Sequence, residues 1–158
     1  MKIQRSAIFA LTAALAFLAM PGTGAASTSS SALATVKRAV MAFNAGDMKA
    51  WVATCGSSTH IIDDFPPFEW QGASACATWW NALMAFMKNN DISNSTVALG
   101  PVWQNVVVGN RAYVVVSATL HSNAHGKPSK EIGSILTVAL RNTANGWVMA
   151  AWSWSQHP

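Results

Sequence analysis

Apolar residues recur three or four positions apart in three stretches of the first half of the chain. This spacing places them on one face of an α-helix. We expect helices over residues 31–45, 47–55 and 72–89, the second of them capped by the Asp47 side chain. Between the second and third helices, residues 59–64 are a short apolar run that ends on two carboxylates, and they predict a strand.

From residue 93 onward the apolar period shortens to two, which is the period of a β-strand. Four strands are expected, separated by the turn signals Gly109-Asn110, His125-Gly126 and Asn145-Gly146. Their predicted ranges are residues 93–108, 111–123, 130–142 and 146–156. The first of these strands should bend near Gly100-Pro101, because proline cannot donate a hydrogen bond to the sheet.

This order of elements predicts an α+β fold. Three N-terminal helices would pack on one face of a strongly curved antiparallel sheet, with the last four strands forming a meander. The chain contains no internal repeat and no sign of a second domain. Residues 27–158 are therefore expected to form a single domain.

The first 26 residues have the features of a cleavable signal peptide. Lys2 and Arg5 precede an uncharged apolar run over residues 7–20, and small residues follow at the expected cleavage site, Gly24-Ala25-Ala26. The run is short for a membrane span of about 20 residues. We therefore expect a secreted or periplasmic protein with no stable membrane anchoring after cleavage.

The charge of the chain gives little support for a nucleic-acid partner. Ten Lys and Arg residues stand against six Asp and Glu, and two of the ten lie in the predicted leader. The remaining basic residues are scattered and form no stripe, unlike those of nucleic-acid-binding proteins. Half of the chain is apolar and eight residues are Trp, which is enough to build a core and line a cavity.

Asp63 is the main candidate for chemistry. It ends the first predicted strand on the same side as Ile61, whereas Asp64 should point to the opposite side, into solvent. A carboxylate beside apolar walls has a raised pKa and can exchange protons near neutral pH. The alternative is an Asp that caps the following loop and is held ionised by backbone N–H groups.

Cys55 and Cys76 both fall on the apolar faces of predicted helices. In an exported protein they could form a disulfide, and two buried free thiols fit the pattern equally well. The His residues lack a third ligand at metal-binding spacing, so we expect no metal site. No cofactor-binding motif is present, and we expect no cofactor.

The residues FNAGD at 43–47 lie between two predicted helices, and the interval from Asp63 to Gly72 joins the first predicted strand to the third helix. With these residues at these places, the order of elements resembles the NTF2-like superfamily, and most of all its SnoaL-like and ketosteroid-isomerase-like branch. The resemblance spans about residues 33–155. It implies a cone in which a curved sheet wraps around the helices and leaves an apolar pocket at its open end, and it implies a homodimer.

Ketosteroid isomerases carry their general base on an Asp near the end of the first strand, nine residues before the glycine that opens the third helix. The resemblance therefore implies that Asp63 is this base. The Tyr and the acid of the isomerase oxyanion hole correspond to Ala39 and to a position near Ile135. Since oxyanion donors supply one of the largest catalytic terms, steroid isomerisation itself is not expected.

Seven residues are candidates for binding a small hydrophobic ligand near Asp63. Two of them, Tyr113 and His121, could replace the missing donors if they face inward. The others are apolar or aromatic, and their alternative role is core packing. The full candidate set is Ile61, Trp80, Met84, Trp103, Tyr113, His121 and Trp154.

Three functions are compatible with these features. The first is an isomerase, cyclase or dehydratase in which Asp63 moves a proton on a small hydrophobic substrate. The second is a non-catalytic module that binds an apolar ligand in the same cavity. The third is a dimerisation domain with a collapsed cavity and a large apolar sheet surface.

Overall fold

The computed structural model describes residues 24–156, in which the chain forms three α-helices and six β-strands. The predicted signal peptide, residues 1–26, lies outside the described residues except for its last three positions. The elements are α1 (Gly24–Asn44), α2 (Met48–Val52), β1 (Cys55–Ile62), β2 (Glu69–Gly72), α3 (Ala75–Asn89), β3 (Ile92–Val108), β4 (Arg111–Ala124), β5 (Lys127–Thr143) and β6 (Gly146–Ser155).

The six strands form one open sheet in the order β2-β1-β6-β5-β4-β3. Strands β3 to β6 are an antiparallel meander, as the alternating pattern predicts. The expectation of a wholly antiparallel sheet is wrong for one pair, because β1 lies parallel to β6. Parallel neighbours need a long crossover connection, and here most of the chain lies between the two strands.

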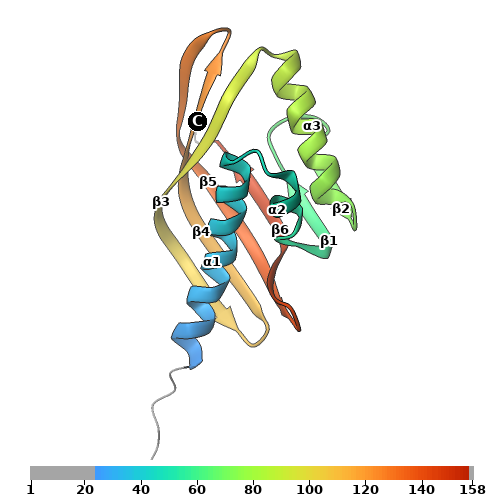
Figure 1. Cartoon of the computed structure of the whole chain (residues 1–158). Helices are drawn as coiled ribbons and strands as arrows, with labels where there is room; N and C mark the ends of the chain where they lie inside the picture. The colour runs from blue at the N-terminus through green and yellow to red at the C-terminus, as the bar shows by residue number, and fades with distance from the viewer. Residues whose placement is uncertain (1–23, 157–158) are drawn as a thin grey trace, which may run out of the picture.

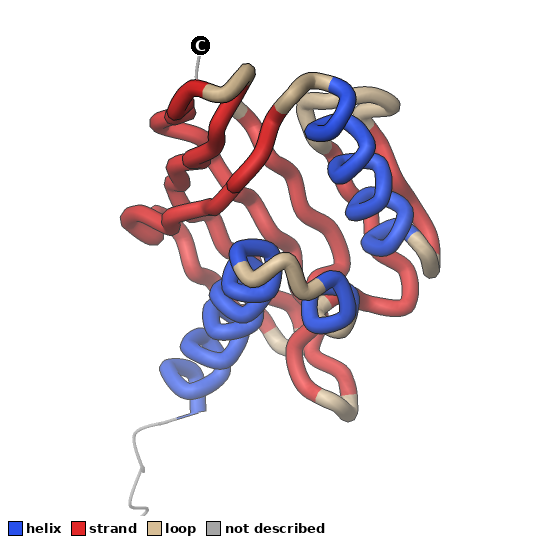
Figure 2. Tube along the Cα trace, turned by 45° about the horizontal axis from the view of Figure 1, so that its top comes forward, coloured by secondary structure: helices blue, strands red, loops and turns tan. Residues whose placement is uncertain are grey.

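All three helices lie on the same face of this sheet (Figures 1 and 2). Helix α1 packs on β3, β4 and β6, and α3 packs on β1, β2 and the start of β3. The predicted apolar stripe of α1 is confirmed, since Val36 and Val40 are buried. They belong to the same core as Val114, Val138 and Met149. Val138 and Met149 alternate with half-buried residues along their strands, whereas Val114 is followed by the buried Val115. The α+β fold is thereby confirmed.

Helix α2 begins at the predicted cap. The Asp47 carboxylate accepts a hydrogen bond from the backbone N–H of Ala50 at 2.9 Å. Just before it, the Asn44 side chain forms two hydrogen bonds with the backbone of Val97, at 2.8 and 2.7 Å. These contacts hold the end of α1 against β3. No helix in the described part of the chain is long and apolar enough to cross a membrane.

The predicted irregularity in β3 is present. The register between β3 and β4 shifts on both sides of Val102, directly after Gly100-Pro101. A Cβ atom at Gly100 would lie 2.5 Å from the Ser117 hydroxyl oxygen, so a larger residue would push this hydroxyl aside. The Ser117 hydroxyl would then lose its hydrogen bond to the Pro101 carbonyl, which is 3.3 Å away.

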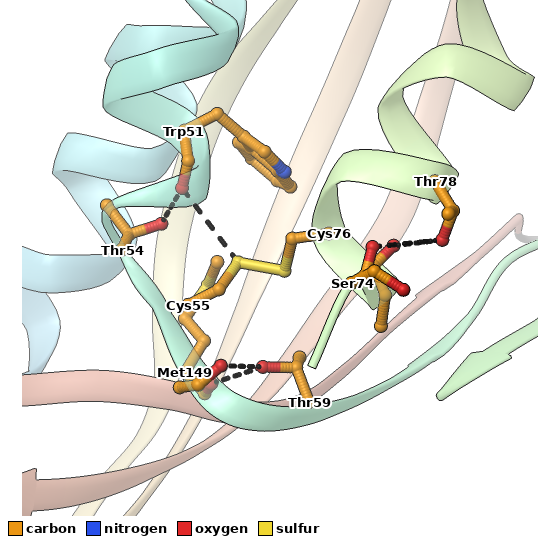
Figure 3. The surroundings of a disulfide bond; sticks show 10 residues. Trp51, Thr54, Cys55, Thr59, Ser74, Cys76, Thr78 and Met149 are labelled. Carbon is orange, nitrogen blue, oxygen red and sulfur yellow. Dashed lines mark hydrogen bonds between the residues drawn. A yellow bond between two sulfur atoms is a disulfide. The ribbon is translucent and has the colours of Figure 1, made fainter. Parts of the chain in front are cut away.

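Two local predictions are wrong between α2 and α3. Cys55 begins β1 instead of ending a helix. The segment between the predicted strand 59–64 and the predicted helix 72–89 contains the short strand β2, which pairs with β1 and ends at Gly72, so the third helix begins only at Ala75. Cys55 forms a disulfide with Cys76 at the start of α3, with 6.6 Å between their Cα atoms (Figure 3). Of the two alternatives for the cysteines, the structure therefore has the disulfide, which links the α2–β1 junction to α3.

Candidate functional site

A cavity of about 260 Å³ lies between the helices and the sheet, partly open to solvent. Its walls come from the end of α1, from α2 and α3, from the segment after β1, and from β3 to β6. Most of its surface is apolar, and several of its lining side chains are aromatic. The aromatic lining residues are Phe43, Trp51, Phe65, Trp79, Phe86, Trp152 and Trp154.

Three indole rings form one wall as a packed unit. Trp51 stacks on Trp79 with 4.9 Å between ring centroids, and Trp152 packs edge-to-face against both rings, at 5.8 and 4.8 Å. These offset and edge-to-face arrangements are the favourable ones for aromatic pairs. Since Trp51 and Trp152 are at least nine-tenths buried, this wall is fixed and can exclude water from the carboxylate beside it.

Asp63 lies directly after β1 and is only 8% exposed. Its Oδ2 atom accepts a hydrogen bond from the Trp79 indole N–H at 2.8 Å, and Oδ1 accepts one from the Asp64 backbone N–H at 2.9 Å. The Asp63 backbone N–H donates to the Phe68 carbonyl at 3.2 Å, which closes the loop. The carboxylate therefore lines the cavity in a defined orientation.

Burial raises the pKa of Asp63 from 3.8 to about 7. Removal of water from the charged form is the main cause, and the negative charge of Asp64 adds to it. The hydrogen bonds from the Trp79 indole and the Asp64 backbone lower the pKa, without cancelling the effect of burial. A carboxyl group with this pKa can accept or release a proton near neutral pH.

Besides Asp63 and its neighbour Asp64, the carboxylate of Glu131 lines the cavity, from β5. Its Oε1 atom accepts hydrogen bonds from the Trp154 indole N–H, at 3.0 Å, and from the Ser134 hydroxyl. Its Oε2 atom accepts one from the Gln156 side-chain amide at 2.9 Å. Glu131 was not among the residues predicted to line the cavity, because a Glu next to Lys130 in a strand has the appearance of an exposed position.

A β-bulge explains why alternation alone does not place Glu131 in the cavity. Leu136 faces inward. If the strand alternated regularly before it, Ile132 would face the helices and Glu131 would face solvent. The β4–β5 register skips Gly133, whose φ of 86° is in the region that favours glycine. The extra residue reverses both side chains, so Ile132 is 67% exposed and Glu131 faces inward. Gly133 is the one residue in the sequence that could have indicated this bulge.

Of the seven predicted ligand-binding residues, Trp154 lines the cavity. Ile61 and Trp80 are buried in the hydrophobic core and do not line the cavity. Their core packing matches the alternative that the sequence left open for apolar residues.

The other four predicted residues are exposed and lie away from the cavity. Met84 is 36% exposed on α3, Trp103 is 56% exposed on β3, and Tyr113 is 43% exposed on β4. His121 is also exposed, on the same face of β4 as Tyr113. Neither Tyr113 nor His121 can therefore replace the missing donors at Asp63.

The two positions that correspond to isomerase donors carry only aliphatic side chains. Ala39 is buried in α1. Ile135 points away from the cavity, because its neighbour Leu136 lines it. As for metals, the described residues contain no group of three or more His, Cys, Asp or Glu that could hold an ion.

A mixed, open sheet with three helices on one face is the fold of the NTF2-like class, which one of the solved structures describes as cystatin-like. Within this class, the chain belongs to the SnoaL-like domain family, whose sequence model matches residues 32–157. No curated protein matches the chain in sequence. The family assignment therefore rests on the domain match and on the fold.

Several solved structures share the fold. A candidate dehydratase of the NTF2-like family from Streptomyces avermitilis has a TM-score of 0.71 and 14% identity, over 84% of this chain and 99% of its own. An NTF2-like superfamily protein from Salmonella enterica serovar Typhimurium has a TM-score of 0.70 and 16% identity, over 84% and 93%. A ketosteroid isomerase-like protein from Erwinia carotovora atroseptica has a TM-score of 0.65 and 17% identity, over 82% of this chain and 95% of its own. At these identities the likeness shows the fold alone.

Proposed function

We propose that the cavity binds a small hydrophobic molecule and that Asp63 removes a proton from it, in an isomerase, cyclase or dehydratase reaction. The observation that carries this proposal is a buried carboxyl group, with a pKa of about 7, on the wall of an apolar cavity. The likeness to a candidate dehydratase of the same fold supports a reaction of this type.

The missing donors limit the reaction. General-base catalysis by a positioned side chain contributes about 10²–10⁴-fold. An oxyanion-hole donor is worth roughly 3–4 kcal/mol more, and Ala39 and Ile135 supply none. We therefore propose a substrate that delocalises its own developing negative charge, or one from which a stable anion leaves.

The Kemp elimination of 5-nitrobenzisoxazole tests the base without requiring the natural substrate. In this reaction a base takes the C3 proton while the ring N–O bond breaks, and the product is a coloured cyanophenolate. We expect the protein to accelerate it and Asp63→Asn to lower the rate at least about 100-fold. The control is Asp91→Asn, an exposed carboxylate at the α3–β3 turn, which should leave the rate unchanged. Equal rates for wild type and Asp63→Asn would refute the proposed base.

The second candidate function is a binding module without catalysis, and the aliphatic side chains at Ala39 and Ile135 favour it. In that case the protein would bind small aromatic molecules and quench its Trp fluorescence, yet show no Kemp activity above that of Asp63→Asn. The two candidates thus differ in turnover and not in binding.

We also propose that the protein works outside the cytoplasm, in the periplasm or the medium. The leader-like residues 1–26 and the Cys55–Cys76 disulfide both support this location, because disulfides persist in oxidising compartments.

A further inference from the structure

The charges around the cavity have one sign. Among the described residues, those that line the cavity include Asp63, Asp64 and Glu131 and no Lys, Arg or His. The three carboxylates do not gather at one point, since no group of three metal-binding side chains exists in this part of the chain. They are spread over the cavity wall, with Asp63 after β1 and Glu131 on β5.

Glu131 is held in place by neutral groups only. Its three hydrogen-bond donors are the Trp154 indole, the Ser134 hydroxyl and the Gln156 amide. Ser134 is fully buried, and the bulge at Gly133 turns Glu131 toward the cavity. The contacts orient the carboxylate without supplying a positive charge, so its own charge has no counterion within the described residues of the cavity wall.

The aromatic walls add a second attraction for a cation. The faces of Trp and Phe rings carry partial negative charge and attract ammonium groups, most strongly where water is excluded. Trp154 lies beside Glu131 with its N–H edge toward the carboxylate, and the Trp154 side chain itself lines the cavity. A carboxylate next to indole rings in an apolar cavity favours an organic cation, and the same surface repels carboxylates and phosphates.

We infer that the cavity takes a small hydrophobic ammonium, with the ammonium at Glu131 and the apolar body between the aromatic walls. This rests on the proposed function in one respect, namely that the cavity binds a small hydrophobic molecule. The volume of about 260 Å³ lies just below the range of roughly 300–1,000 Å³ found for drug-sized ligands, so the body should be one or two fused rings.

Three probes that share one ring system test the charge preference. Naphthalen-1-ylmethylamine is a cation at neutral pH, naphthalen-1-ylmethanol is neutral, and 1-naphthoic acid is an anion. Isothermal titration calorimetry with the purified protein should give an affinity for the amine about tenfold above that for the alcohol, because a hydrogen bond to a charged group is the stronger one. The acid should bind weakest.

The variants Glu131→Gln and Glu69→Gln test whether Glu131 is the source of the preference for the amine. Glu131→Gln should lower the affinity for the amine about tenfold and leave the affinity for the alcohol within twofold. Glu69→Gln, at an exposed position of β2, should change neither. With Asp63→Asn the preference for the amine should persist although Kemp activity is lost, so the two proposals fail separately.

Two results would overturn the inference alone: an alcohol or acid that binds as tightly as the amine, or an amine preference that survives Glu131→Gln. If none of the three probes binds, the proposed ligand-binding role fails and the inference fails with it. Should Glu131→Gln not fold, the ranking of the three probes with the wild-type protein still decides.

Discussion

Asp63 shows how two hydrogen bonds can be outweighed by the loss of water. A hydrogen bond to a charged group stabilises it by about 1.5–3 kcal/mol, and Asp63 accepts two, from the Trp79 indole and the Asp64 backbone. Its pKa is nevertheless raised to about 7, since the indole wall removes the solvent that would stabilise the charge. The sequence left open an Asp63 that caps the following loop through backbone N–H groups. One of its two hydrogen-bond donors is indeed a backbone N–H, that of Asp64.

The raised pKa of Asp63 predicts a pH dependence of stability. The folded protein holds the proton more tightly than the unfolded chain, so this group favours folding most below about pH 4. Its contribution is lost as the pH rises to about 7, by up to roughly 4 kcal/mol. Asp63→Asn should remove this decline. Urea unfolding of both proteins from pH 4 to pH 8 measures the difference, and parallel pH profiles would contradict the raised pKa.

At the scale of elements, the disulfide fixes the part of the cavity built by helices. Cys55 follows α2 and Cys76 lies in the first turn of α3, so the bond holds together the two helices that carry Trp51 and Trp79 (Figure 3). Those two rings are the stacked pair of the cavity wall.

Replacing both cysteines, Cys55→Ser with Cys76→Ser, should destabilise the protein by about 3 kcal/mol. This is the loop-closure entropy expected for a sequence separation of 21 residues. Thermal or urea unfolding measures the loss, and the wild-type protein under reducing conditions should match the double variant. A double variant as stable as the oxidised wild type would show that the bond contributes nothing to folding.

The sequence predicted the long elements well, because each has many residues in one period. Strands β3 to β6 and helix α3 lie within a few residues of their predicted ranges. Alternation separates the two faces of a strand without saying which one is inside, and this is why Tyr113 was a candidate although it lies outside. The single extra residue Gly133 reverses the faces, so Glu131 could not be placed from the pattern.

At the scale of the whole molecule, the face of the sheet away from the helices carries exposed apolar side chains. Val106 and Tyr113 are paired neighbours on β3 and β4 and are 51% and 43% exposed. Ile62 on β1 and Ile132 on β5 are more than half exposed. Exposed apolar side chains on one face of a sheet are a feature of protein–protein interfaces, and we propose that this face forms the homodimer that the resemblance implies.

Sedimentation analysis tests the dimer with one substitution. The wild-type protein should sediment as a dimer, and Val106→Lys should shift it toward the monomer, because burying an unpaired charge in an apolar interface is costly. Val106 does not line the cavity, so probe binding should be unchanged. A wild-type monomer at high protein concentration would exclude the proposed interface.

The proton on Asp63 is the most direct test of the account as a whole. Carbon-13 NMR of the aspartate side-chain carboxyl groups, with Asp63→Asn to assign the signal, measures its titration in the folded protein. We expect a midpoint of about 7, well above that of an ordinary Asp. A midpoint near 4 would contradict the account, since it would mean that the carboxylate is hydrated and that the cavity does not bury an acid–base group.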